Sequence, residues 1–149
     1  MKNIERIAKQ ISQIYYLAYT STILSAIIGY LITYSRETVL IERTSELGII
    51  LTRILYIYML ASIPGSLALF NKYTKKWSKL EDEKQKLHEY KKGSTYRLII
   101  IGICSVASIA LFYAIKDVSF IYCFGISAIA LFFCKPNVTK IANELDIEE

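Results

Sequence analysis

The sequence predicts an all-α integral membrane protein, with four transmembrane helices in an antiparallel bundle and amphipathic helices on the cytoplasmic side. The first observation is that the 149-residue chain is 54 % hydrophobic, above the roughly 45–50 % of ordinary soluble domains. The second is that apolar residues gather in four stretches almost free of charge, at 14–34, 49–70, 98–115 and 118–134. A helix needs roughly 17–25 apolar residues to cross a bilayer, and it satisfies its backbone amides within the stretch.

The distribution of lysine and arginine predicts the orientation of these spans. Both residues crowd into the N-terminal segment, the connection at 71–97 and the C-terminal tail, whereas the connections at 35–48 and 116–117 hold few of them. Because positively charged segments stay on the cytoplasmic side, we predict that both termini and the long middle connection are cytoplasmic. The abundance of isoleucine, lysine and tyrosine is typical of a low-GC bacterium, so we expect a multi-pass protein of the bacterial cytoplasmic (inner) membrane.

The first part of the chain divides into an amphipathic helix at 1–13 and a span at 14–34. Before the span, apolar residues recur at helical spacing: Ile4, Ile7, Ala8 and Ile11. Within the span, small residues follow at intervals of four: Ser21, Ser25, Gly29 and Thr33. Small residues so spaced let another helix approach closely, so we interpret them as a helix-packing face. The alternative is the polar lining of a pore.

The second span, at 49–70, also has two small residues four positions apart, Ala61 and Gly65. Pro64 lies between them, and because proline removes a backbone donor we predict a kink in this helix. Arg53 lies just inside the outer end of the span, and Glu46 lies earlier on nearly the same helix face. We predict an outer-face ion pair between these two residues, with a ligand site as the alternative.

The connection at 71–92 contains neither glycine nor proline and is predicted to be an amphipathic cytoplasmic helix. Its apolar face comprises Tyr73, Trp77, Leu80 and Leu87. Such a helix extends about 30 Å, farther than the short segment after it can recover. It must therefore lie along the membrane surface, facing lipid or a protein partner, or break partway; in the simplest reading it is a solvated connector. Arg97, at the start of the next span, is well placed for a lipid phosphate.

The last two spans, at 98–115 and 118–134, are separated only by Lys116 and Asp117. They must therefore lie antiparallel beside each other. Pro136 ends the fourth span and begins the tail at 137–149. There Asn137 is expected to cap a short helix with an apolar face of Val138, Ile141, Ala142 and Leu145.

The sequence contains no catalytic motif, and we expect no cofactor, no metal and no nucleic-acid partner. The first span lacks the carboxylate on which small multidrug exporters depend. Cys104, Cys123 and Cys134 are solitary in apolar surroundings, and His88 has no neighbouring ligand residue. We predict a non-enzymatic protein that acts through assembly in the lipid bilayer, as a homo-oligomer or as the small subunit of a membrane complex. Two alternatives stay open: a pore-forming or permeabilising protein of holin or effector type, and a small-solute transporter that uses the proline kink and the outer arginine.

Overall fold

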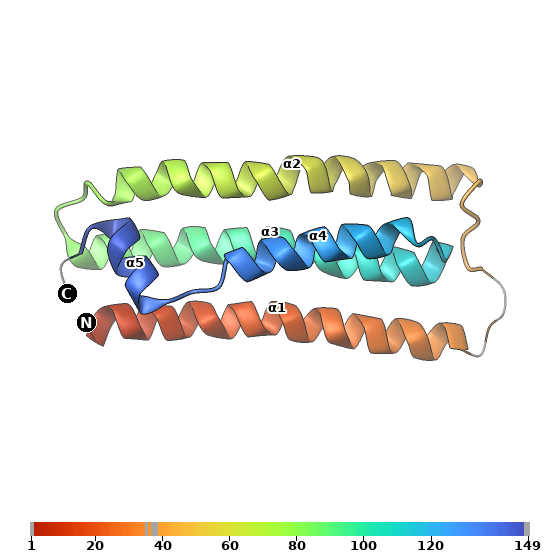
Figure 1. Cartoon of the computed structure of the whole chain (residues 1–149), viewed down its shortest axis with the longest axis horizontal. Helices are drawn as coiled ribbons and strands as arrows, with labels where there is room; N and C mark the ends of the chain where they lie inside the picture. The colour runs from red at the N-terminus through yellow and green to blue at the C-terminus, as the bar shows by residue number, and fades with distance from the viewer. Residues whose placement is uncertain (1, 35, 37–38, 148–149) are drawn as a thin grey trace.

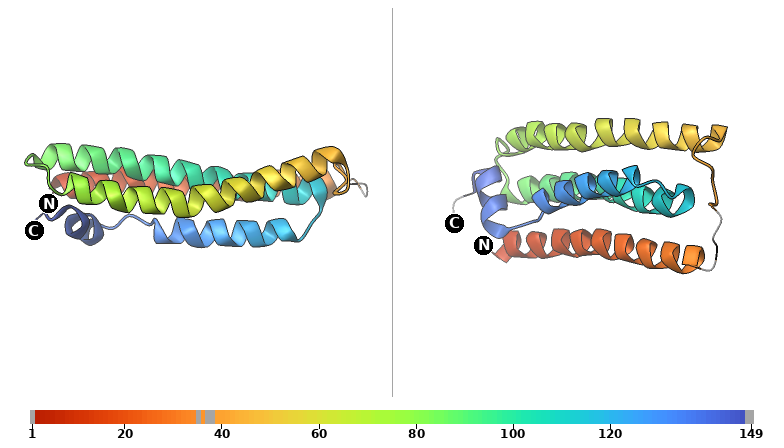
Figure 2. Two further views of the ribbon diagram at one scale, coloured as in Figure 1. Left: turned by 90° about the horizontal axis from the view of Figure 1, so that it is seen from above. Right: turned by 45° about the vertical axis from the view of Figure 1, so that its right-hand side comes forward.

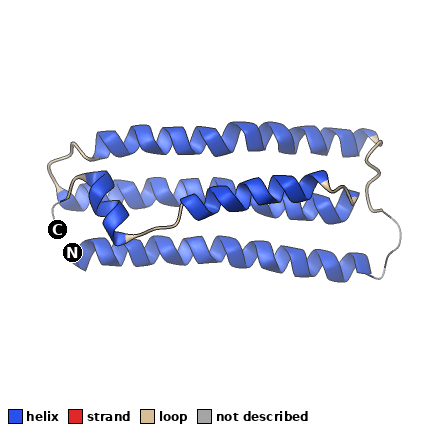
Figure 3. Cartoon of the chain, viewed as in Figure 1, coloured by secondary structure: helices blue, strands red, loops and turns tan. Residues whose placement is uncertain are grey.

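A computed structural model describes residues 2–34, 36 and 39–147. Over these residues the chain forms five helices and no strand (Figure 3): α1 (Lys2–Tyr34), α2 (Glu46–Trp77), α3 (Glu83–Ile115), α4 (Ser119–Phe133) and α5 (Val138–Leu145). The prediction of an all-α protein is confirmed, and α1, α2 and α3 are each long and apolar enough to cross a membrane. Met1 of the predicted segment 1–13 and residues 148–149 of the predicted tail lie outside the described residues.

The three long helices lie side by side in one layer, with α3 between α1 and α2 (Figure 1). α4 packs on one face of this layer, mainly against α3, as the turned views show (Figure 2). The N-terminus, the α2–α3 connection and α5 lie at one end of the molecule, and the α1–α2 and α3–α4 connections lie at the opposite end. We call the first the lysine-rich end, after Lys75, Lys76, Lys79, Lys84 and Lys86.

α1 is a single helix that runs through both predicted segments, 1–13 and 14–34. Its 33 residues correspond to about 50 Å, which exceeds the roughly 30 Å of a hydrocarbon core. The N-terminal part therefore extends beyond the apolar segments at the lysine-rich end. Ile4 and Ile11 of the predicted amphipathic stripe are buried there, in the same cluster as Ile141 of α5.

The charged connection between the second and third apolar stretches is a helical hairpin. α2 ends at Trp77 and α3 begins at Glu83, so the structure lacks the single helix predicted over 71–92 and has the break partway along it. The new helix begins where Asp82 caps it, because the Asp82 carboxylate accepts the N–H of Lys84 at 3.1 Å. The charged first half of α3 then continues without interruption into its apolar second half.

α4 is shorter than the other apolar helices. Its 15 residues extend about 22 Å, less than a hydrocarbon core of about 30 Å. α5 follows after a bend of 74°, so the two helices count as one broken segment and the predicted four-span bundle is not established. Asn137 caps α5 as predicted, accepting the N–H of Thr139, and Ile141 and Leu145 of the predicted apolar face are buried.

Two polar contacts tie α3 to its neighbours in the layer. The hydroxyls of Thr22 on α1 and Ser105 on α3 are 3.3 Å apart and buried. From α2, the hydroxyl of Tyr58 donates to the carbonyl of Ile100 at 2.9 Å. Each bond contributes about 1 kcal/mol net, but a buried group left without its partner costs more. These contacts therefore favour one rotation of α1 and of α2 about their own axes.

Candidate functional site

A groove of about 520 Å³ opens between α2 and α3 toward the lysine-rich end. Four residues of the predicted lipid- or partner-facing surface line it together: Tyr73, Trp77, Leu80 and Arg97. The fifth, Leu87, does not, because its side chain is 3 % exposed in the core. We call this hollow the aromatic groove, because four aromatic residues line it: Phe70, Tyr73, Trp77 and Tyr96.

Trp77 is held in the wall of the groove by a close approach to α3. A Cβ atom added at Gly93 would lie 2.3 Å from Cη2 of Trp77, so the indole packs directly on the helix backbone at this glycine. The indole also stacks on Tyr73, with ring centroids 6.0 Å apart and planes 19° apart, and meets Phe70 edge to face at 5.9 Å. Glycine in the middle of α3 is thus explained by packing, since a helix interior otherwise disfavours it.

Arg97 is the buried cation of the groove. Arg97 is only 7 % exposed, and its Cζ lies 3.7 Å from the centroid of the Phe70 ring. The Nε atom is buried without a hydrogen-bond partner, and no carboxylate among the described residues forms an ion pair with the guanidinium. Lys76 and Lys92 add positive charge to the groove lining, and Glu89 adds the one carboxylate there among the described residues.

A second hollow follows the interface between α1 and α3. It consists of two neighbouring parts of about 430 and 500 Å³, and Ser21 lines both. We call it the small-residue groove, because small side chains of both helices line it: Ala18, Ser21, Ser25, Gly29, Gly102, Ala107 and Ala110. Its described lining comes from α1, α3 and Leu40 of the α1–α2 connection, so it lies on the face of the layer that α4 leaves free.

The structure brings all four members of the predicted small-residue stripe of α1 to this groove. Gly29 is a contact point within the chain, since an added Cβ would lie 2.4 Å from Cδ2 of Tyr113 on α3. The hydroxyl of Ser21 donates to the carbonyl of Leu17, and that of Thr33 donates to the carbonyl of Gly29. Ser21 itself is exposed, so part of the stripe remains available to a neighbour.

The predicted packing face of α2 lies elsewhere. Ala61 and Pro64 are exposed, and a Cβ added at Gly65 would meet nothing within 4 Å. The helix runs continuously past Pro64 and bows gently along its length (Figure 2). These three residues therefore make no contribution to either groove.

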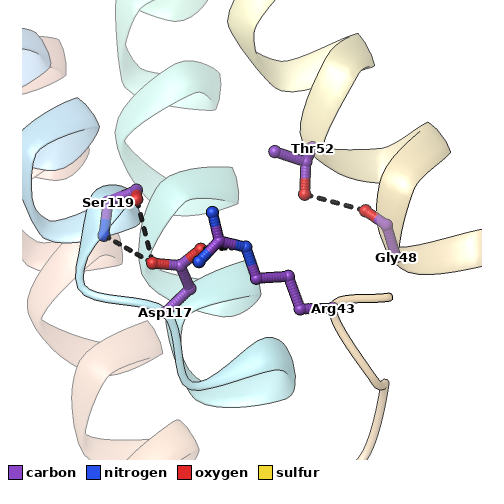
Figure 4. A network of polar contacts seen from close by, with 5 residues as sticks. All are labelled: Arg43, Gly48, Thr52, Asp117 and Ser119. Atoms are coloured by element: carbon purple, nitrogen blue, oxygen red, sulfur yellow. Dashed lines mark hydrogen bonds and ion pairs between the residues drawn. The ribbon is translucent and has the colours of Figure 1, made fainter. Parts of the chain in front are cut away.

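The ion pair at the opposite end differs from the predicted one. Among the described residues the single ion pair joins Arg43 of the α1–α2 connection to Asp117 of the α3–α4 turn, with Nε and Oδ2 3.0 Å apart (Figure 4). Glu46 and Arg53 do not pair, and both are exposed. Sequence reasoning missed Arg43 and Asp117. The signal available was that the two polar residues Lys116 and Asp117 alone link two apolar stretches and so indicate a tight turn.

Asp117 also holds the start of α4. Its carboxylate accepts the backbone N–H of Ser119 at 3.0 Å and the hydroxyl of Ser119 at 2.9 Å (Figure 4). The hydrogen bond from the Ser119 N–H, together with the Arg43 guanidinium, holds the pKa of Asp117 below its ordinary 3.8. This carboxylate is therefore a structural anion that links two connections.

No group of three or more histidine, cysteine or acidic side chains among the described residues is placed to hold a metal ion. Cys104, Cys123 and Cys134 are buried free thiols.

Comparison with protein-family models, curated protein sequences and solved structures finds no match.

Proposed function

We propose that this chain is a non-enzymatic, multi-pass protein of the bacterial cytoplasmic membrane that acts through assembly, as a homo-oligomer or as the small subunit of a membrane complex. The observation that carries the proposal is the small-residue groove, which lies on the uncovered face of the helix layer. Its partner is a helix of a second membrane protein or of a second copy of the chain. No nucleic acid is involved.

Helix association in lipid supports this reading of the groove. Lipid tails are as apolar as leucine, so helices associate through close packing at small residues rather than through a hydrophobic driving force. The groove is bordered by exposed Leu17, Leu24 and Ile28 of α1, which supply the ridges that a neighbouring helix packs between. The hydroxyls of Ser21 and Thr33 donate to carbonyls within α1, which favours packing over the lining of a pore.

In the proposed topology the lysine-rich end is cytoplasmic and α1, α2 and α3 cross the membrane. α4 is a short fourth crossing that returns the chain to the cytoplasmic side, where α5 lies across the end of the layer. The clustering of the N-terminus, the α2–α3 connection and α5 at one end supports this arrangement (Figure 1), as does the positive-inside rule.

The test is the native mass of the full-length protein in lipid nanodiscs, with one variant in each face. Ser21→Leu fills the centre of the small-residue groove and is expected to abolish assembly while membrane insertion is retained. Ala61→Leu adds the same side chain to the exposed face of α2 and serves as the matched control. A wild-type protein that is monomeric and co-purifies with no second polypeptide contradicts the proposal. Unchanged assembly in Ser21→Leu contradicts the role of the groove.

A further inference from the structure

We propose that the aromatic groove is a binding site for one anionic phospholipid, with the phosphate against the Arg97 guanidinium and an acyl chain along Leu69 and Ile100. This site is formed within a single chain, so it does not depend on the assembly proposed above.

The Arg97 side chain is buried without an anionic partner among the described residues. Burying a guanidinium removes it from water, and this is unfavourable unless an anion and hydrogen bonds compensate it. In this structure the ring of Phe70 contacts it at 3.7 Å, but Nε is buried without an acceptor and the described residues supply no carboxylate within ion-pair distance. Arginine presents a planar fork of donors that matches phosphate oxygens. The missing partner is therefore an anion with oxygen acceptors.

The rest of the groove combines positive charge with a largely apolar lining. Beside Arg97, Lys76 and Lys92 make the lining net positive despite Glu89. Apart from Ser66 and Gln85, the remaining lining side chains are apolar or aromatic, and they continue onto exposed surface, where Leu69 is 54 % and Tyr96 is 59 % exposed. Tyrosine and tryptophan are the residues that favour the boundary between lipid and water. A ligand that fills the groove must therefore be anionic at one end and apolar at the other.

Along α2 and α3, the groove extends from the apolar stretches into the charged hairpin. Leu69 and Ile100 belong to the apolar stretches 49–70 and 98–115, whereas Lys76, Lys92 and Gln85 belong to the charged hairpin at the lysine-rich end. The groove thus crosses the level at which a bilayer changes from headgroup to hydrocarbon. A free inorganic phosphate satisfies only Arg97, whereas a phospholipid satisfies both halves.

Trp77 makes the proposal testable, because it is the chain's single tryptophan and it lines the groove. The full-length protein is reconstituted in phosphatidylcholine, and phosphatidylglycerol with brominated acyl chains is titrated in while tryptophan fluorescence is recorded. We expect saturable quenching that exceeds the quenching by brominated phosphatidylcholine at the same mole fraction. This excess quenching by brominated phosphatidylglycerol persists in about 0.5 M salt, where attraction by exposed lysines is screened. Unlabelled phosphatidylglycerol abolishes it by competition.

Variants separate the site from general surface charge. Arg97→Gln is expected to weaken the preference for phosphatidylglycerol by about tenfold or more, since it removes a charge-assisted bidentate contact, and Arg97→Lys restores part of it. Lys72→Gln removes a charge from the same end outside the groove and leaves the preference unchanged. The Ser21→Leu variant retains the preference, so failure of this proposal and failure of the assembly proposal are distinguishable.

Two results overturn the proposal, and neither depends on whether an Arg97 variant folds. Equal quenching of the wild-type protein by the two brominated lipids shows that the groove does not select an anionic headgroup. Loss of the difference on addition of inorganic phosphate shows that Arg97 binds a soluble anion and that no lipid is required.

Discussion

The close approach of α1 to α3 at Gly29 predicts that alanine is less stabilising there than at Gly65 of α2. In Gly29→Ala the new Cβ lies 2.4 Å from Cδ2 of Tyr113, whereas ordinary contacts begin near 3.4 Å, so the ring must move by about 1 Å. In Gly65→Ala the new Cβ meets nothing within 4 Å. Both glycines lie inside helices with φ in the normal helical range, so the gain in helix propensity, about 1 kcal/mol, is common to both variants.

The difference between the two variants therefore isolates the steric term. Overpacking at a close contact costs about 1–3 kcal/mol. We expect Gly65→Ala to be up to about 1 kcal/mol more stable than the wild type, and Gly29→Ala to be less stable than Gly65→Ala by about 1–3 kcal/mol. Gly125→Ala on α4, where the added Cβ also meets nothing within 4 Å, provides a second unhindered reference.

The assay is reversible unfolding of the purified protein in mixed micelles at increasing denaturing detergent, followed by circular dichroism. A double variant, Gly29→Ala with Tyr113→Leu, tests the cause. Once the ring is removed, Gly29→Ala should cost little or no stability relative to Tyr113→Leu alone. If Gly29→Ala is as stable as Gly65→Ala, Tyr113 is not packed on Gly29, and the described interface between α1 and α3 is incorrect.

The remaining predictions concern the opposite end and the aromatic groove. Asp117→Ala removes the acceptor for the Ser119 N–H and is expected to cost about 1 kcal/mol of stability in the same unfolding assay. Asp117→Asn retains an acceptor and loses only the ion pair with Arg43, whose side chain is exposed, so its cost is expected to be about 0–1 kcal/mol. The folded-state pKa of Asp117 is lowered. The contribution of this carboxylate to stability is therefore present above the ordinary pKa of 3.8 and is lost as pH falls through the folded pKa. Thermal unfolding from about pH 5 downward should show this loss in the wild type and not in Asp117→Asn. Gly93→Ala forces Trp77 away from α3, since the added Cβ would lie 2.3 Å from Cη2 of Trp77, and is expected to shift tryptophan emission to longer wavelength; an unchanged spectrum contradicts the packing of Trp77 on Gly93.

Comparison of prediction and structure shows which features are local. The three long helices, the short helix after Asn137 and the buried stripe that begins at Ile4 follow from composition and helical spacing, because apolar periodicity is imposed by the environment of each helix separately. The cap of Asn137 and the alternative of a break within 71–92 also needed only local chemistry and chain length.

The features that were missed depend on pairs of residues far apart in the sequence. Glu46 and Arg53 share one helix face in the sequence, yet Arg43 forms its ion pair with Asp117 from a distant connection. The stripe at Gly29 indicated packing, but only the register of α1 against α3 identifies Tyr113 as its neighbour. An apolar stretch indicates that a helix avoids water, but it does not indicate whether lipid or another helix covers each face.

The sequence by itself therefore determined that this chain is helical and that its lysines gather in particular connections. It predicted four spans, of which the structure has three as helices long and apolar enough to cross a membrane. The tertiary structure decided that the charged connection folds into a hairpin, that Trp77 packs on Gly93 and that Arg97 lies buried beside Phe70 without an anionic partner. The physical reason is that helix formation depends on residues a few positions apart, whereas grooves arise from the rotation and register of two helices, which distant side chains set together.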